Sequence, residues 1–101
     1  MISREGDCLR VSGHLTMETA AALFDIGAQL AGEKVEVVID LAQVETVDSA
    51  AVSLLLGWLR EARRGNVNLC FAHVPENVIS LAKLYGVLDL LPLCHDHAVP
   101  A

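Results

Sequence analysis

Asp48 and Ser49 are the residues best placed for chemistry, because they lie where an apolar strand pattern gives way to an amphipathic helix pattern. Here a hydroxyl and a carboxylate would lie beside the free N–H groups of a helix start. They would also lie at the carboxyl end of a parallel strand, where open α/β sheets often bind ligands. The structural alternative is that one of the two residues caps the helix, since Asp and Ser are both preferred N-cap residues.

Catalysis by Ser49 has little support in the sequence. The nucleophile elbow Gly-x-Ser-x-Gly does not occur, and nothing ties His14 or His73 to the serine, since both are expected on the surface at strand ends. There is no glycine-rich phosphate loop. The run 94–97 (Cys-His-Asp-His) lacks the spacing of a closed zinc site. We therefore expect no catalytic residue, no cofactor and no metal.

Composition indicates one domain with an aliphatic core. The chain has 101 residues, of which 53% are hydrophobic and only 4% aromatic, and this length suffices for a core without metals or disulfides. The net charge of −6 argues against nucleic acid and anionic lipid as partners. The three cysteines, Cys8, Cys70 and Cys94, are odd in number and widely spaced, which predicts unpaired thiols and a reducing compartment.

No targeting or membrane segment is expected. Residues 1–7 lack the basic-then-apolar pattern of a signal peptide. The longest apolar stretch, Ala50–Leu59, is far shorter than the roughly 20 residues that span a bilayer. We therefore expect no direct insertion into a membrane.

The first part of the chain predicts two strands and a helix. Alternating apolar and polar residues predict a strand over 8–12, with 1–4 as its hairpin partner. A helix is expected over 17–31, with Thr16 as N-cap and Gly32 as its stop.

The rest of the chain alternates strands and helices. The apolar run in 35–40 predicts a strand buried on both faces. A helix over 52–64 and a strand over 67–72 follow, and then a helix from Pro75 to Gly86 with Tyr85 on its core face. The order β(β)αβαβα predicts an α/β domain over 1–93, with helices packed on a mixed sheet of about four strands. Residues 94–101 are expected to form a flexible tail.

The helix predicted over 52–64 has an apolar arc of about 200° and an opposite face with small and charged residues. That opposite face carries Ala50, Ser53, Gly57, Arg60, Glu61 and Arg64. Either this face is simply solvated, or its small side chains allow close approach of another helix or loop. In the second case Gly57→Leu is expected to impair docking and to leave the fold intact.

Several stretches resemble a known family, the STAS domains of sulfate transporters and anti-sigma-factor antagonists. They are Asp40-Leu41, Val44 and the junction 47–51 (Val-Asp-Ser-Ala-Ala), which three leucines follow closely. Within that family, 82–87 and 90–92 are most similar to the small STAS subunits of Mla-type phospholipid-transport ABC systems. The resemblance covers almost the whole chain and implies the STAS fold.

In those subunits the junction reads Asp-Thr-Gly-Gly, so Ser49 takes the place of the threonine. The resemblance implies that Ser49 and the helix start contact the ATPase subunit and support the assembly and activity of the transporter. The implied partner-binding residues are Asp48, Ser49, Ala50, Ser53, Gly57 and Arg60, with Ser49 also the candidate regulatory hydroxyl. It further implies a non-enzymatic, cytoplasmic subunit peripheral to the inner membrane, and it leaves homodimerisation open.

The alternative within the family is an anti-sigma-factor antagonist that binds a kinase-like anti-sigma factor. Such antagonists usually read Asp-Ser-Ser-Gly or Asp-Thr-Ser-Gly, and the partner kinase phosphorylates the second hydroxyl. In this chain Ala50 and Ala51 occupy the last two positions. The resemblance therefore favours the transporter subunit over the phosphorylation switch.

Overall fold

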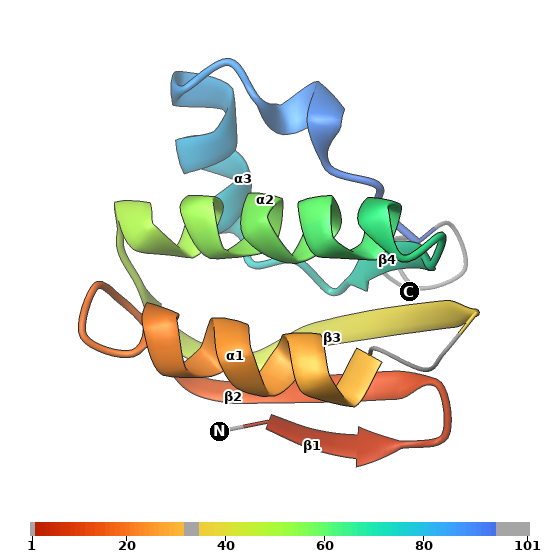
Figure 1. The fold of residues 1–101 in the computed structure, drawn as a ribbon. Coiled ribbons are helices and arrows are strands. Elements are labelled where there is room, and N and C mark those ends of the chain that lie inside the picture. Colours follow the sequence, from red (N-terminus) through yellow and green to blue (C-terminus); the bar gives the residue numbers. More distant parts are fainter. Residues whose placement is uncertain (1, 32–34, 95–101) are drawn as a thin grey trace.

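The computed structural model describes residues 2–31 and 35–94 as four strands, three α-helices and one 3-10 helix (Figure 1). These are β1 (Ile2–Glu5), β2 (Cys8–Leu15), α1 (Ala20–Ala31), β3 (Glu36–Val47), α2 (Ser49–Arg64), β4 (Asn68–Ala72), α3 (Glu76–Leu84) and η1 (Leu88–Leu90). The strands form one sheet in the order β1-β2-β3-β4, in which β1 is antiparallel to β2 and the other pairs are parallel. The predicted fold class and element order are confirmed.

Helices α1 and α2 lie side by side over one face of the sheet (Figure 1). The side chains that β3 directs toward them, Val37, Ile39 and Leu41, are buried. Those directed to the other face, Val38 and Asp40, are only half-buried. The expectation that this strand is buried on both faces is therefore wrong, because the helices cover one face and leave the other to solvent.

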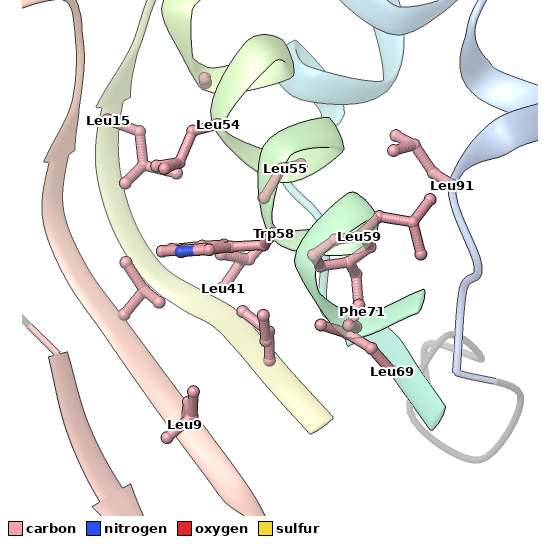
Figure 2. Packing of buried hydrophobic residues seen from close by; sticks show 14 of the residues in the cluster. Leu9, Leu15, Leu41, Leu54, Leu55, Trp58, Leu59, Leu69, Phe71 and Leu91 are labelled. Atoms are coloured by element: carbon pink, nitrogen blue, oxygen red, sulfur yellow. The ribbon is translucent and has the colours of Figure 1, made fainter. Parts of the chain in front are cut away.

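Two close contacts set the packing of α1 against α2. The indole of Trp58 lies on Gly27, where even a Cβ atom would collide with the ring, and its Nε1 donates to the carbonyl of Phe24 at 3.2 Å. In the reverse direction, a Cβ on Gly57 would lie 3.1 Å from the Phe24 ring. Figure 2 shows Trp58 among leucines of α2 and the strands. A leucine at Gly57 would press on Phe24, so the expectation that Gly57→Leu leaves the fold intact stays a prediction that depends on how far this ring can shift.

The strands flanking α1 are longer than predicted, and α1 is shorter. β3 continues to Val47 because its second half pairs with the end of β2, through register shifts after Arg10 and Gly13. α1 begins at Ala20 rather than at residue 17. The hydroxyl of Thr19 donates to the carbonyl of His14 at 2.7 Å and accepts from the backbone N–H of Thr16 at 3.0 Å.

These two hydrogen bonds fold residues 16–19 into a turn before the helix, so Thr16 does not cap a helix starting at residue 17. The predicted stop at Gly32 lies outside the described residues.

The third helix agrees in part with its prediction. Gly86 ends it with a φ of +71°, a conformation that glycine adopts without strain. Pro75 is the N-cap residue rather than the first helical residue. Tyr85 is the C-cap and is 50% exposed, so the side chain expected on the core face also reaches the surface. Val78 and Ala82 are the buried residues of α3.

Cys70 and Cys94 form a disulfide with a Cα–Cα distance of 5.0 Å, while Cys8 is free. Pro92 and Cys94 also exchange backbone hydrogen bonds with Phe71, so the chain after η1 runs along the outer edge of β4. The prediction of unpaired thiols is therefore wrong for Cys70 and Cys94. Of the tail predicted over 94–101, only Cys94 lies in the described part of the chain. A spacing of 24 residues does not reveal this pairing, which depends on where the chain returns to the sheet.

Residues 95–101, with most of the 94–97 run, lie outside the described part of the chain. In the described ranges 2–31 and 35–94, no helix is long and apolar enough to cross a membrane.

Gly27→Ala is expected to lower the free energy of unfolding by about 1–3 kcal/mol, because the added methyl group must push the Trp58 indole out of its place. Urea denaturation measures this loss. Gly65→Ala is the matched control, since its Cβ would meet no atom closer than 3.7 Å, and we expect it to be neutral or to stabilise by up to about 1 kcal/mol. Equal stability of Gly27→Ala and the unmodified chain would contradict the packing described.

Candidate functional site

The side chain of Asp48 holds two segments together at the start of α2. Its Oδ1 accepts the backbone N–H of Ala50 at 2.8 Å, which makes Asp48 the N-cap of α2. Its Oδ2 accepts the backbone N–H of Met17 at 3.0 Å, across 31 residues of sequence. The capping role considered from the sequence is thus confirmed for Asp48. The bond to Met17 has no signal in the sequence, because it depends on where the turn before α1 folds back.

Ser49 follows as the first residue of α2 and is exposed. Its hydroxyl makes no hydrogen bond to any residue of the ranges 2–31 and 35–94. One turn further along the helix, Ser53 is exposed as well. Two hydroxyls therefore point to solvent at the start of the helix, available to a partner.

Beside these serines an open groove of about 810 Å³ lies between α1, α2 and the end of α3. Ser49, Ala50 and Ser53 line it from α2, and Phe24 lines it from α1. We call this the serine groove; the rest of its lining is mostly apolar and includes Met17, Ala20, Val52, Leu56, Tyr85 and Val87. The structure thus brings together three of the six residues predicted to bind a partner.

Exposed apolar side chains stand at the rim of the serine groove. Met17 is 78% exposed and Tyr85 is 50% exposed. Methionine and tyrosine are enriched at protein–protein interfaces, and an exposed apolar patch rimmed by polar groups is typical of a docking site. Sequence reasoning did not assign Met17, Phe24 or Tyr85 to the site, because only the packing of three helices brings them to one groove.

The other three residues predicted to bind a partner, Asp48, Gly57 and Arg60, do not line the serine groove. Asp48 is engaged in its two hydrogen bonds. Gly57 contacts Phe24 of the same chain, so its small size already serves the packing of α1. Arg60 is exposed two turns beyond Ser53, in a second groove with Leu56 and Leu90.

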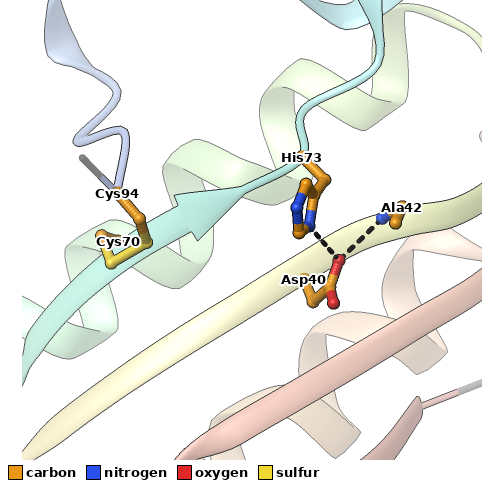
Figure 3. A network of polar contacts seen from close by, with 5 residues as sticks. All are labelled: Asp40, Ala42, Cys70, His73 and Cys94. Atoms are coloured by element: carbon orange, nitrogen blue, oxygen red, sulfur yellow. Dashed lines mark hydrogen bonds and ion pairs between the residues drawn. A yellow bond between two sulfur atoms is a disulfide. The ribbon is translucent and has the colours of Figure 1, made fainter. Parts of the chain in front are cut away.

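A polar pair lies on the opposite face of the sheet (Figure 3). His73 Nδ1 is 3.1 Å from Asp40 Oδ1, which also accepts the backbone N–H of Ala42 at 2.9 Å. Burial alone would raise the pKa of Asp40, but the hydrogen bond from Ala42 and the contact with His73 outweigh it and hold the pKa below its ordinary value of 3.8. His73, directly after β4, therefore pairs with the Asp40 carboxylate of β3 and does not approach Ser49.

Burial, followed by the charge of Asp40, raises the pKa of the Cys8 thiol above its ordinary value of 9.0. Only the thiolate is a good nucleophile, so Cys8 is a weakly reactive cysteine.

Asp40→Asn is expected to flatten the pH dependence of stability in acid. Because folding lowers the pKa of Asp40, the stabilisation is complete above the unfolded pKa near 4 and is lost as the pH falls through the folded pKa. Urea denaturation between pH 6 and pH 2.5 should show a smaller acid loss for Asp40→Asn than for the unmodified chain. Asp25→Asn, an exposed carboxylate on α1, is the control, and a similar flattening in both variants would contradict the assignment.

Asp48→Asn and Asp48→Ala separate the two hydrogen bonds of this side chain. Asparagine keeps one oxygen for the cap but cannot accept the N–H of Met17, so we expect a loss of about 1 kcal/mol in unfolding free energy. Alanine removes both acceptors and should cost about 2 kcal/mol. Urea denaturation measures both losses. An asparagine variant as stable as the unmodified chain would show that the bond to Met17 contributes nothing.

The chain is similar in sequence to a known protein family. The family described as "Mlab, STAS domain" matches residues 1–92. The intermembrane phospholipid transport system binding protein MlaB of Escherichia coli (strain K12) is 33% identical over 88 residues, which cover 86% of this chain and 89% of that protein. The protein of the same name from Shigella flexneri matches equally well.

Solved structures share the fold at lower identity. The anti-sigma factor antagonist SpoIIAA in its unphosphorylated form superposes with a TM-score of 0.70 at 13% identity, covering 97% of this chain and 90% of that one. An anti-sigma factor antagonist from Mycobacterium paratuberculosis has a TM-score of 0.70 at 21% identity, covering 97% and 87%. At these identities the likeness shows the fold alone. The match to the family over residues 1–92, with the identity to MlaB, shows that this chain belongs to the STAS domain family and to its MlaB group.

Proposed function

We propose that this chain is the non-enzymatic STAS subunit of an Mla-type phospholipid-transport ABC transporter. In this proposal it binds the ATPase subunit through the serine groove and supports the assembly and activity of the complex. Its place is then the cytoplasmic face of the inner membrane, where it is held by the ATPase and not by lipid. The observation that carries the proposal is the serine groove itself, with two free hydroxyls and exposed apolar side chains on a domain that is homologous to MlaB.

The shape of the groove supports a protein contact. The small side chains of Ser49, Ala50 and Ser53 leave the first turns of α2 accessible on this side. Met17 and Tyr85 supply apolar area at the rim, as interface anchors do. A helix or loop of the partner that entered the groove would cover this area and could hydrogen-bond the hydroxyls.

The anti-sigma-factor antagonist remains the second candidate, on the evidence of shared fold. The phosphorylation switch of that family needs a hydroxyl where this chain has Ala50. At this junction the hydroxyl is on Ser49, so a regulatory modification would have to fall one residue before Ala50. Co-purification with an ABC ATPase supports the transporter subunit, whereas capture of a kinase that adds phosphate to the chain would support the antagonist.

Ser49→Glu is expected to weaken binding to the ATPase subunit encoded in the same genome by about tenfold or more, because it places a larger, charged group in the contact. Calorimetry or surface plasmon resonance measures the affinity. The fold should be unharmed, since a carboxylate in the first turn of a helix interacts favourably with the helix dipole.

Ser80→Glu is the matched control. Ser80 is exposed on α3 and does not line the serine groove, so the same charge change there should alter the affinity less than about twofold. Equal affinities of Ser49→Glu and Ser80→Glu would remove the serine groove from the contact. If the unmodified chain failed to bind the ATPase, the proposed function itself would be wrong.

A further inference from the structure

A second groove, of about 450 Å³, lies between the last turns of α2 and η1. Among the described residues, its lining consists of three arginines, Arg60, Arg63 and Arg64, and three leucines, Leu56, Leu59 and Leu90. We call it the arginine groove. Leu90 is 50% exposed, so the wall that η1 contributes presents apolar surface to solvent.

The charge of the arginine groove is opposite to that of the chain. The protein carries a net charge of −6 with only seven lysines and arginines, yet three of these lie within five consecutive residues of one helix. Arg64 pairs with Glu61 at 3.0 Å. Arg60 and Arg63 form no ion pair with any residue in 2–31 or 35–94, so two guanidinium groups remain available to an outside carboxylate.

The arginine groove continues the serine groove. Leu56 lines both of them. Ser49, Ser53, Leu56 and Arg60 follow one another at spacings of four, three and four residues, which places them on one stripe of α2. A protein segment that entered the serine groove and followed this stripe would reach the arginines after about two helical turns, or roughly 11 Å.

We propose that the arginine groove receives an acidic, amphipathic segment of the same partner protein that occupies the serine groove. Carboxylates of the segment would pair with Arg60 and Arg63, which suit bidentate recognition. Its apolar side chains would cover Leu56 and Leu90. This inference rests on the proposed function for the identity of the partner, and it adds the chemistry of the segment.

Arg60→Glu and Arg63→Glu, singly and together, test the groove against the purified ATPase. Reversal of one charge should weaken binding about tenfold, and reversal of both should weaken it further. The affinity of the unmodified chain should fall with added salt more steeply than that of the double variant, because the lost attraction is electrostatic. Urea denaturation of each variant verifies that the fold is retained.

Arg4→Glu is the matched control. Arg4 is exposed on β1, at the opposite edge of the sheet from β4, and the substitution changes the net charge equally. Its effect on affinity should be less than about twofold. If Ser49→Glu weakened binding but Arg60→Glu and Arg63→Glu behaved like Arg4→Glu, the arginine groove would be excluded and the proposed function would stand.

A synthetic probe tests the groove without the ATPase. A 14-residue helical peptide with glutamates on one face and leucines on the other should shift the NMR methyl signals of Leu56 and Leu90 in the unmodified chain. The same shifts should be lost in the double variant and absent with a peptide that carries lysine in place of glutamate. No shift with the acidic peptide would overturn the proposal. Arginine-dependent binding to vesicles of anionic phospholipid, without binding to the acidic peptide, would also overturn it.

Discussion

The candidate site depends on the two hydrogen bonds that the carboxylate of Asp48 accepts. One oxygen caps α2 and the other holds the backbone of Met17, so a single side chain fixes the start of α2 relative to the turn that leads into α1. The serine groove lies between these two segments. An aspartate at this position is therefore a structural residue that shapes the site, while the exposed hydroxyl beside it remains free for a partner.

The packing of α1 against α2 uses small residues inside the domain. Trp58 fills the space over Gly27, and the ring of Phe24 lies against Gly57. The helices approach closely in their middle, whereas at the start of α2 the small side chains of Ser49 and Ser53 border an open groove. Glycine and serine on one helix thus have different roles, which spacing along the helix does not distinguish.

The parts of the fold that could be predicted are those set by local pattern. The 3.6-residue period of α2, its Asp-Ser start and the alternation of strands with helices predicted the architecture and a helix cap at either Asp48 or Ser49. The second half of β3 was missed because Glu45 and Thr46 are polar and exposed, and its strand character comes from pairing with β2. Sequence patterns also did not reveal two other features: the pairing of Cys70 with Cys94, and the positions of Met17 and Tyr85 in the serine groove. Each depends on residues that are distant in sequence and meet only in the folded chain.

The disulfide between Cys70 and Cys94 lies at the edge of the sheet that β4 forms. An uncovered edge strand presents free N–H and C=O groups on which a strand of another molecule can pair, the first step of edge-to-edge aggregation. Residues 92–94 occupy this edge of β4 through hydrogen bonds to Phe71, and the bond from Cys70 to Cys94 makes the cover covalent. Under reducing conditions the same edge is shielded by noncovalent contacts alone. The cover of β4 is thus covalent only where the surroundings keep Cys70 and Cys94 oxidised.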